Sequence, residues 1–354
     1  GNLFFFATGI FGVGVLLSLD PVVAQAVGAG DKEGVARGVQ RGLILSLFLA
    51  ALTSLALLPA GVVFRAAGQP TEVIPIAVGY ALASIPGTLP FFLFVVFRQS
   101  LQATGRVAPI LWATLAANVV NFALNWVLIW GNLGVPRLGA VGSSWATSIS
   151  RWFLAAAVLV VAWPLLRPML RPWRSGVSRL RPLARMLLLG VPIGLQLQLE
   201  WGAFAVTGLL MGLLGTEEMA GHLIALNLAS FAFMVPLGIG AAASVRIGQE
   251  VGRGEPGSAR RAAGGALAIG LAFMLCTALL FLAFPTALGR TFSDDLAVVG
   301  VVTLLLPIAG VFQVFDGLQA VAGGVLRGIG DTRAPMWANI LGFWVLGLPL
   351  SLLL

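Results

Sequence analysis

The sequence predicts an all-α, polytopic membrane protein, and three observations support this fold class. Of the 354 residues, 59% are hydrophobic and 10% are charged, whereas soluble domains carry about 25% charged residues. Apolar runs of roughly 20 residues, each long enough to cross a bilayer as a helix, recur along the whole chain. The runs are continuous rather than alternating, which argues against the strands of a transmembrane β-barrel.

Ten segments of the chain are expected to cross the membrane as helices. Both ends of the chain lie inside apolar runs, and the first residue is Gly1 rather than methionine. We therefore expect the chain to be a fragment of a longer parent protein. The predicted spans are 2–27, 40–63, 72–103, 107–131, 138–163, 185–214, 218–247, 262–285, 295–326 and 335–354.

The basic residues gather on one side of the predicted membrane. Seventeen of the 21 lysines and arginines fall in one set of alternating loops, three fall in the other set, and Arg151 lies inside a span. Because cytoplasmic loops carry an excess of Lys and Arg, the basic segment 164–184 is expected in the cytoplasm. Topology thus explains the net charge of +8, and we expect no nucleic-acid partner. The expected location is a plasma membrane, in bacteria the inner membrane, with membrane lipid around a multi-pass monomer.

Two loops of the first half of the chain recur in the second half. "QAVGAGDKEGVARG" from Gln25 matches "QEVGRGEPGSARRA" from Gln249, an offset of 224. "LQATGRVAP" from Leu101 matches "LRGIGDTRAP" from Leu326, an offset of 225. Two matches at nearly one offset indicate an internal duplication. Six spans separate each loop from its copy, so the repeat is expected to be parallel, with a pseudo-two-fold axis along the membrane normal.

The duplication divides the chain into two lobes joined by the basic segment. Residues 1–163 are assigned to an N-terminal lobe, 164–184 to a cytoplasmic linker and 185–354 to a C-terminal lobe. When the repeat offset is used to map the spans of each half onto the other half, one span of each half has no counterpart in the present chain. The parent protein is therefore predicted to have twelve spans, in two parallel six-helix bundles. The present chain would hold helices 2–6 and 7–11 of that parent and lack its first and last helices.

Two carboxylates of the C-terminal lobe lie far from any predicted loop. Glu200 has Gln196 one helical turn before it, and Gln313, Asp316 and Gln319 are expected to share one face of their helix at steps of three. No basic residue of the same spans is expected to neutralise either acid. Intramembrane acids are costly and usually functional, so we expect both to bind a coupling cation. The residue types leave Na⁺, held by carboxylate and amide oxygens, and H⁺, carried by one buried carboxyl, as open alternatives.

The duplication supplies a comparison for Asp316. The residue 225 positions earlier is Phe91, so the fold itself does not require an acid at this place.

Asp20 is the third acid inside a span, and its place beside Pro21 favours a structural role at a helix interface or cap. Arg151 is expected to pair within its lobe or to extend toward the membrane surface, and we do not assign it to a site.

Three asparagines lie on one face of the predicted span 107–131. Asn118, Asn121 and Asn125 stand at positions i, i+3 and i+7 of a helix. Hydrogen bonding between helices and a role in ion binding are equally consistent with this pattern.

In their order along the chain, these segments resemble the multidrug and toxic compound extrusion (MATE) family. The resemblance implies two six-helix lobes around a cleft and export of small cationic or amphipathic organic compounds, driven by entry of H⁺ or Na⁺ and without a further cofactor. In its NorM-like branch a glutamate and an aspartate couple the ion to transport, and Glu200 and Asp316 match those positions. Asn121 and Asn125 match a polar network of the first lobe. The segments that carry the resemblance are "VVAQAVGAGD", "ANVVNFALNWVLIWG", "LGAVGSSWAT", "VPIGLQLQLEWGAF", "MVPLGIGAAASVRIGQEVGRG" and "FDGLQAVAGGVLRGIGDTRAP".

Two other functions are weighed against drug export. A flippase for lipid-linked saccharides, from the same superfamily, usually lines its cavity with basic residues, whereas these spans carry acids and favour a cationic cargo. A membrane enzyme is disfavoured because the sequence has one histidine, His222, and no span combines histidine with a nucleophile. Phe312 stands where some NorM-like proteins have a tyrosine, and the missing hydroxyl weakens the case for Na⁺ over H⁺.

Overall fold

The computed structural model describes residues 2–353, and within them every regular element is helical. The chain forms two compact units, Gly1–Gln198 and Leu199–Leu354, whose boundary falls inside the helix α10 (Leu180–Leu214). The all-α prediction is confirmed. The lobe limits 1–163 and 185–354 were inferred from the duplication and stay a prediction.

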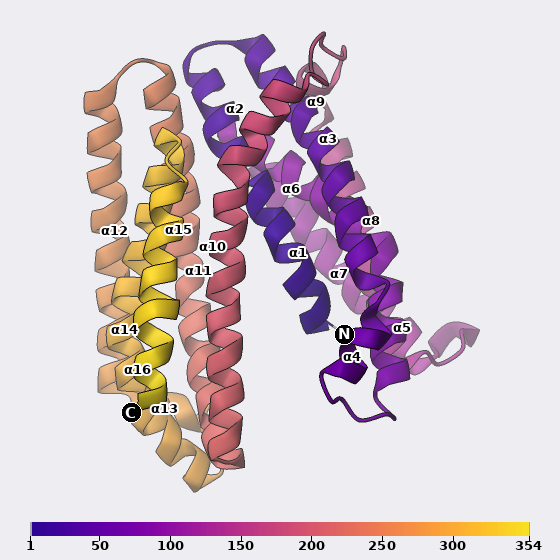
Figure 1. Cartoon of the computed structure of the whole chain (residues 1–354), viewed down its shortest axis with the longest axis vertical. Helices are drawn as coiled ribbons and strands as arrows, with labels where there is room; N and C mark the ends of the chain where they lie inside the picture. Colours follow the sequence, from indigo (N-terminus) through magenta and orange to yellow (C-terminus); the bar gives the residue numbers. More distant parts are fainter. Residues whose placement is uncertain (1, 354) are drawn as a thin grey trace. The chain divides into compact units, whose positions relative to one another are not determined.

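The first unit is built of short and long helices (Figure 1), which pack around buried apolar side chains. One cluster of buried residues joins α6 to α7, α8 and α9 through Phe97, Leu101, Ala113, Val158 and Leu166. The elements of this unit before α10 are α1 (Asn2–Leu16), α2 (Leu19–Gly28), α3 (Lys32–Leu57), α4 (Ala60–Ala66), α5 (Ile74–Ser84), the 3₁₀ turn η1 (Ile85–Gly87), α6 (Thr88–Ala103), α7 (Ala108–Trp130), the 3₁₀ turn η2 (Asn132–Gly134), α8 (Gly139–Val161) and α9 (Trp163–Leu170).

In the second unit, α14 packs against both α11 and α12 (Figure 1). Glycines allow α11 and α14 to approach closely: a Cβ atom built on Gly324 would lie 2.7 Å from the Cα of Gly240 and overlap its carbonyl group. The elements after α10 are α11 (Thr216–Gly252), α12 (Pro256–Ala283), α13 (Pro285–Arg290), α14 (Leu296–Ile329), α15 (Arg333–Asn339), the π-helix η3 (Ile340–Gly347) and α16 (Leu348–Leu353).

Among the described residues, nine helical stretches are long and apolar enough to cross a membrane. They run from Asn2–Gly28 to Leu296–Ile329 and correspond to the first nine of the ten predicted spans. The tenth span, 335–354, differs from the expectation of one long α-helix, because α15 passes directly into the π-helix η3 and then into α16. A π-helix bonds residue i to residue i+5, so it interrupts the α-helical ladder, and such segments often occur at functional sites.

Helix boundaries repeat between the two units, as the internal duplication predicts. Moving the start of α3, residue 32, by 224 gives 256, the first residue of α12. The same shift moves α4 to 284–290, and α13 spans Pro285–Arg290. A shift of 225 moves the start of α7, residue 108, to 333, the first residue of α15.

The matching loops owe their sequence similarity to the way a helix ends. Gly30 and its copy Gly254 have φ angles of 70° and 76°, and Gly105 and its copy Gly330 have 71° and 91°. Left-handed backbone just after a helix lets the last carbonyl groups accept hydrogen bonds, and glycine adopts it without steric cost. The "GAGD" and "GRGEP" segments are therefore helix-ending turns.

One buried glutamine attaches the basic segment 164–184 to α3. The Gln40 side chain is fully buried, and its Nε2 lies 3.1, 3.3 and 3.0 Å from the carbonyl oxygens of Met169, Leu170 and Pro172. Its Oε1 accepts a hydrogen bond of 2.9 Å from the backbone N–H of Arg174.

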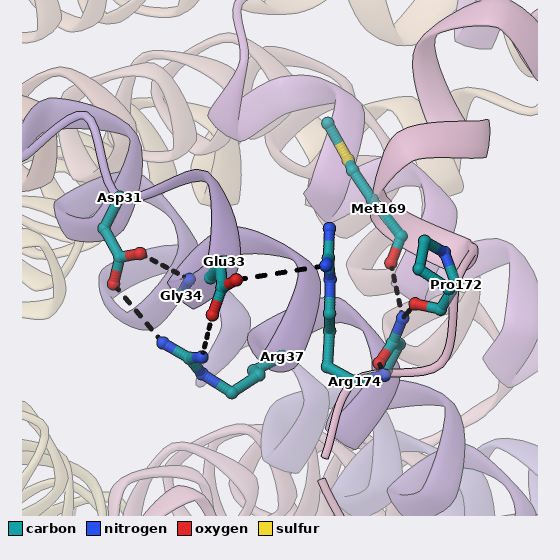
Figure 2. A network of polar contacts seen from close by, with 8 residues as sticks. Asp31, Glu33, Gly34, Arg37, Met169, Pro172 and Arg174 are labelled. Carbon is teal, nitrogen blue, oxygen red and sulfur yellow. Dashed lines mark hydrogen bonds and ion pairs between the residues drawn. The ribbon is translucent and has the colours of Figure 1, made fainter. Parts of the chain in front are cut away.

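Ion pairs continue this network at the surface, as Figure 2 shows. Glu33 lies 2.8 Å from an Arg37 nitrogen and 3.9 Å from an Arg174 nitrogen. The carboxylate of Asp31 caps α3 by accepting a hydrogen bond of 2.8 Å from the N–H of Gly34. The start of α3 is thus the docking surface for the segment that follows α9.

Gln40→Leu is expected to free this segment and speed its proteolysis. The leucine leaves three partly shielded carbonyl groups without their side-chain donor, and loss of such a hydrogen bond costs about 0.5–1.5 kcal/mol. Limited trypsin digestion of the full-length protein should therefore cut after Arg174 roughly tenfold faster, because cleavage follows the population of the open form. The matched control is Gln69→Leu, at an exposed glutamine. Equal cleavage rates in the two variants would contradict the docking role.

Candidate functional site

A chain of hydrogen bonds reaches Glu200 from two other helices of the second unit. Asn339, the last residue of α15, is fully buried and donates from Nδ2 to Glu200 Oε2 at 3.0 Å. Gln319 of α14 in turn donates from Nε2 to Asn339 Oδ1. The adjacent π-helix adds a second link, since Trp344 Nε1 donates to the carbonyl oxygen of Leu199 at 3.0 Å. Together these bonds fix the orientation of the Glu200 carboxylate.

Asp316 lies on α14, within electrostatic range of Glu200. Its Oδ1 is shielded from solvent and has no hydrogen-bond donor among residues 2–353, the part of the chain that the structure describes. A buried carboxylate oxygen without a donor is costly. A proton or a metal cation bound there would remove that cost.

A basic residue lies closer to this pair than we expected. Arg327, in the last turn of α14, is within electrostatic range of Glu200. It stands one residue beyond the predicted span 295–326, and its long side chain brings the charge into range of the acid. The prediction about bases within the spans is therefore not contradicted, but a base just beyond the span 295–326 interacts with Glu200.

The glutamines beside Asp316 face different helices. Gln313 is buried and donates from Nε2 to Thr277 Oγ1 of α12 at 3.0 Å, whereas Gln319 binds Asn339. Six residues on an α-helix turn through about 600°, which separates the two side chains by roughly 120° around the axis. The prediction of a single polar face that includes Gln313 is corrected: of the two glutamines, Gln319 joins the Glu200 network. Gln196 lies half-buried on α10, one turn before Glu200, in the first unit.

Asparagines of the first unit connect α7 to α8. Asn121 donates from Nδ2 to Ser150 Oγ at 3.2 Å, and Asn125 donates to Asn121 Oδ1 at 3.0 Å. Of the two expected roles for this face, the interhelical hydrogen bond is the one observed. A role for Asn121 and Asn125 in ion binding stays a prediction.

Two other intramembrane charges of the first unit have partners. Asp20 is buried and accepts a hydrogen bond from Gln99, which joins α2 to α6 and agrees with the expected interface role. The guanidinium carbon of Arg151 lies 4.0 Å from the ring centre of Phe5 and 4.9 Å from that of Phe91. Arg151 therefore neither pairs with an acid among the described residues nor extends to the surface, because two aromatic rings stabilise its charge within the lobe.

Phe91 is the counterpart of Asp316 in the duplication, and the charges around these two equivalent positions have opposite signs. In the first unit an aromatic ring lies against a built-in cation. In the second unit a carboxylate lies near another carboxylate.

Sequence reasoning missed Asn339, although a signal for it exists. Within the predicted span 335–354 it is the single amide, and there is no charged residue. A lone amide in a span needs a hydrogen-bonding partner, just as a lone acid does. The described residues hold no group of three His, Cys, Asp or Glu side chains that could bind a metal ion. The available donors are two carboxylates with amide neighbours, a set of hard oxygen ligands suited to Na⁺ or to a proton.

Comparison with known proteins gives a consistent family match. The model of the MatE family matches residues 1–127 and 192–353. The chain is 36% identical over 366 residues to a probable multidrug resistance protein NorM of Bradyrhizobium diazoefficiens, covering 98% of the chain and 76% of that protein. It is 32% identical over 357 residues to the multidrug resistance protein MdtK of Edwardsiella ictaluri, covering 100% of the chain and 78% of that protein. The solved structure of the eukaryotic MATE transporter AtDTX14 shares the fold, with a TM-score of 0.87 and 23% identity over 98% of this chain and 77% of the other.

Proposed function

The chain belongs to the MatE family of membrane transporters, and from this premise we propose that it exports cationic or amphipathic organic compounds in exchange for H⁺ or Na⁺. Its relatives are named multidrug resistance proteins, so it is a multidrug efflux transporter and not an enzyme. The finer part of the proposal assigns ion coupling to Glu200 and Asp316, with Asn339 and Gln319 orienting Glu200.

One observation carries the assignment: Asp316 and Glu200 interact electrostatically, and Asp316 Oδ1 has no donor within the described residues. A bound monovalent cation offsets one of the two negative charges and so removes the repulsion between them, and its departure restores that repulsion. The loaded and empty forms thus favour different arrangements of α10, α14 and α15. A difference in free energy between two arrangements is what alternating access requires.

The proposal is tested with the full-length protein that contains this chain, reconstituted in liposomes. Export of ethidium is followed while an H⁺ gradient and a Na⁺ gradient are imposed separately. We expect one of the two gradients to drive ethidium export. Movement of a fluorescent lipid-linked saccharide, with ethidium unaffected by either gradient, would instead support the flippase alternative.

Asn339→Leu is expected to shift the ion dependence of export without unfolding the protein. The leucine removes the hydrogen bond that orients Glu200, and a hydrogen bond to a charged group contributes about 1.5–3 kcal/mol. The concentration of the coupling ion at half-maximal export should therefore rise about tenfold if the ion is Na⁺, which needs an oriented carboxylate, and fall by a similar factor if it is H⁺, because a carboxylate that loses a donor binds a proton more tightly. Asn227→Leu is the control, because Asn227 donates only to Leu223 of its own helix. A loss of maximal rate with an unchanged half-maximal concentration would argue against an orienting role.

A further inference from the structure

The helix α9 has one face in the protein core and one at its surface. Leu166 is fully buried, and Leu165 and Met169 pack beside it against the cluster of α6, α7 and α8. Trp163 and Arg167 lie one helical turn apart on the opposite face, and Arg171 follows directly after the end of the helix in extended backbone. All three are exposed. Short helices with this pattern lie at the membrane surface rather than across it.

An open pocket of about 700 Å³ lies on this exposed face. Its position at the end of α8 places it where a spanning helix leaves the bilayer. The lining residues are Trp163, Arg167, Leu170, Arg171, Pro172 and Trp173.

Positive charge in this pocket is not neutralised by the protein. Within the described residues, the side chains of Arg167 and Arg171 make neither an ion pair nor a hydrogen bond, whereas the neighbouring Arg174 pairs with Glu33. The sequence itself carries no aspartate or glutamate anywhere in 73–199. The two guanidinium groups are therefore available for an anion from outside the chain.

We propose that this pocket binds the phosphate headgroup of an anionic phospholipid, with Arg167 and Arg171 on the phosphate and Trp163 and Trp173 at the headgroup level. Guanidinium groups bind phosphate oxygens through paired hydrogen bonds. Tryptophan prefers the boundary between headgroups and acyl chains. Basic pockets beside spanning helices are suited to anionic lipids of the adjacent leaflet.

The mixed lining distinguishes a lipid from a free phosphate ion. Leu170, Pro172 and the two indole rings offer apolar surface next to the guanidinium groups, and an inorganic ion has nothing to place there. A phospholipid fills both parts, since its glycerol and acyl carbons follow directly on its phosphate. This binding site is independent of ion coupling, because none of its residues belongs to the Glu200 network.

The test measures lipid bound to the full-length protein after purification from vesicles of phosphatidylglycerol or of phosphatidylcholine. We expect Arg167→Gln with Arg171→Gln to bind phosphatidylglycerol roughly tenfold more weakly, since each basic residue near the surface adds to the attraction. Arg181→Gln with Arg185→Gln removes the same charge just outside the pocket and should retain the lipid. Equal loss in both double variants, or no loss in either, overturns the proposal.

Two further measurements complete the test. Phosphatidylglycerol with brominated acyl chains should quench tryptophan fluorescence, and Trp163→Phe with Trp173→Phe should remove part of that quenching. Inorganic phosphate at millimolar concentration should not displace the lipid, and displacement would mean a simple anion site instead. Unchanged thermal unfolding of each variant in phosphatidylcholine shows that folding is intact, and a double variant that fails this check is replaced by Arg167→Gln alone or Arg171→Gln alone, each of which should still weaken lipid binding.

Discussion

Full-length protein carrying Glu200→Gln with Asp316→Asn is expected to lose gradient-driven ethidium export completely. The amides keep the size and most hydrogen bonds of the acids but cannot take up and release a cation. Asn339 can still donate to the side-chain carbonyl group of the introduced glutamine, so the hydrogen-bond chain from Gln319 persists. Export from liposomes under each gradient, compared with empty liposomes, measures the effect.

The control for this experiment removes two acids that lie outside the network. Glu217→Gln with Asp294→Asn changes the same charge at two exposed positions of the same unit and should leave export intact. The single variants Glu200→Gln and Asp316→Asn distinguish the roles of the two acids in ion binding. If Asp316 holds the exchangeable ion, Asp316→Asn alone abolishes the dependence on the gradient, whereas Glu200→Gln shifts it. Normal export by the double variant would exclude the proposed coupling site.

Gly324→Ala is expected to lower the stability of the second unit by forcing two of its helices apart. A Cβ atom there would overlap the carbonyl group of Gly240 and lie 2.7 Å from its Cα. These atoms belong to the backbone of α11, so the two helices must separate. Overpacking of a tight interface costs typically about 1–3 kcal/mol, and a clash with backbone lies at the upper end. The midpoint of thermal unfolding in detergent should fall by several degrees.

A glycine two residues from Gly240 supplies the matched control. Gly238 lies on α11 and a Cβ atom built there meets nothing within 4 Å. Gly238→Ala should therefore leave the midpoint unchanged or raise it, because alanine favours a helix over glycine by roughly 0.5–1 kcal/mol. A similar fall in both variants would mean that helix propensity, and not the α11–α14 contact, determines the effect.

Spans and turns were predictable because they depend on local sequence. Hydropathy located nine of the spanning helices, and the glycines of the repeated loops marked where helices end. Asp316 and Glu200 could be paired in advance, since isolated intramembrane acids need partners. Their coupling role was suggested by the family resemblance and awaits the transport experiment.

Tertiary contacts between distant segments were not predictable. The bond between Asn339 and Glu200 joins residues 139 positions apart, and spacing within one helix says nothing about it. The same holds for Gln40, which binds carbonyl groups about 130 residues later. Gln313 was misassigned because steps of three drift around a helix, so equal spacing did not mean equal direction.

The place of Phe91 against Arg151 has a consequence for how the two halves diverged after duplication. An aspartate at position 91 would lie beside a built-in guanidinium group and be neutralised permanently, so it could not exchange a cation. An acid at this position of the first half would instead form a fixed ion pair with Arg151. In the second half the counterpart of Phe91 is Asp316, whose Oδ1 has no hydrogen-bond donor within the described residues. An arginine on a neighbouring helix thus distinguishes the half in which an acid at this position would be held permanently from the half in which it would not.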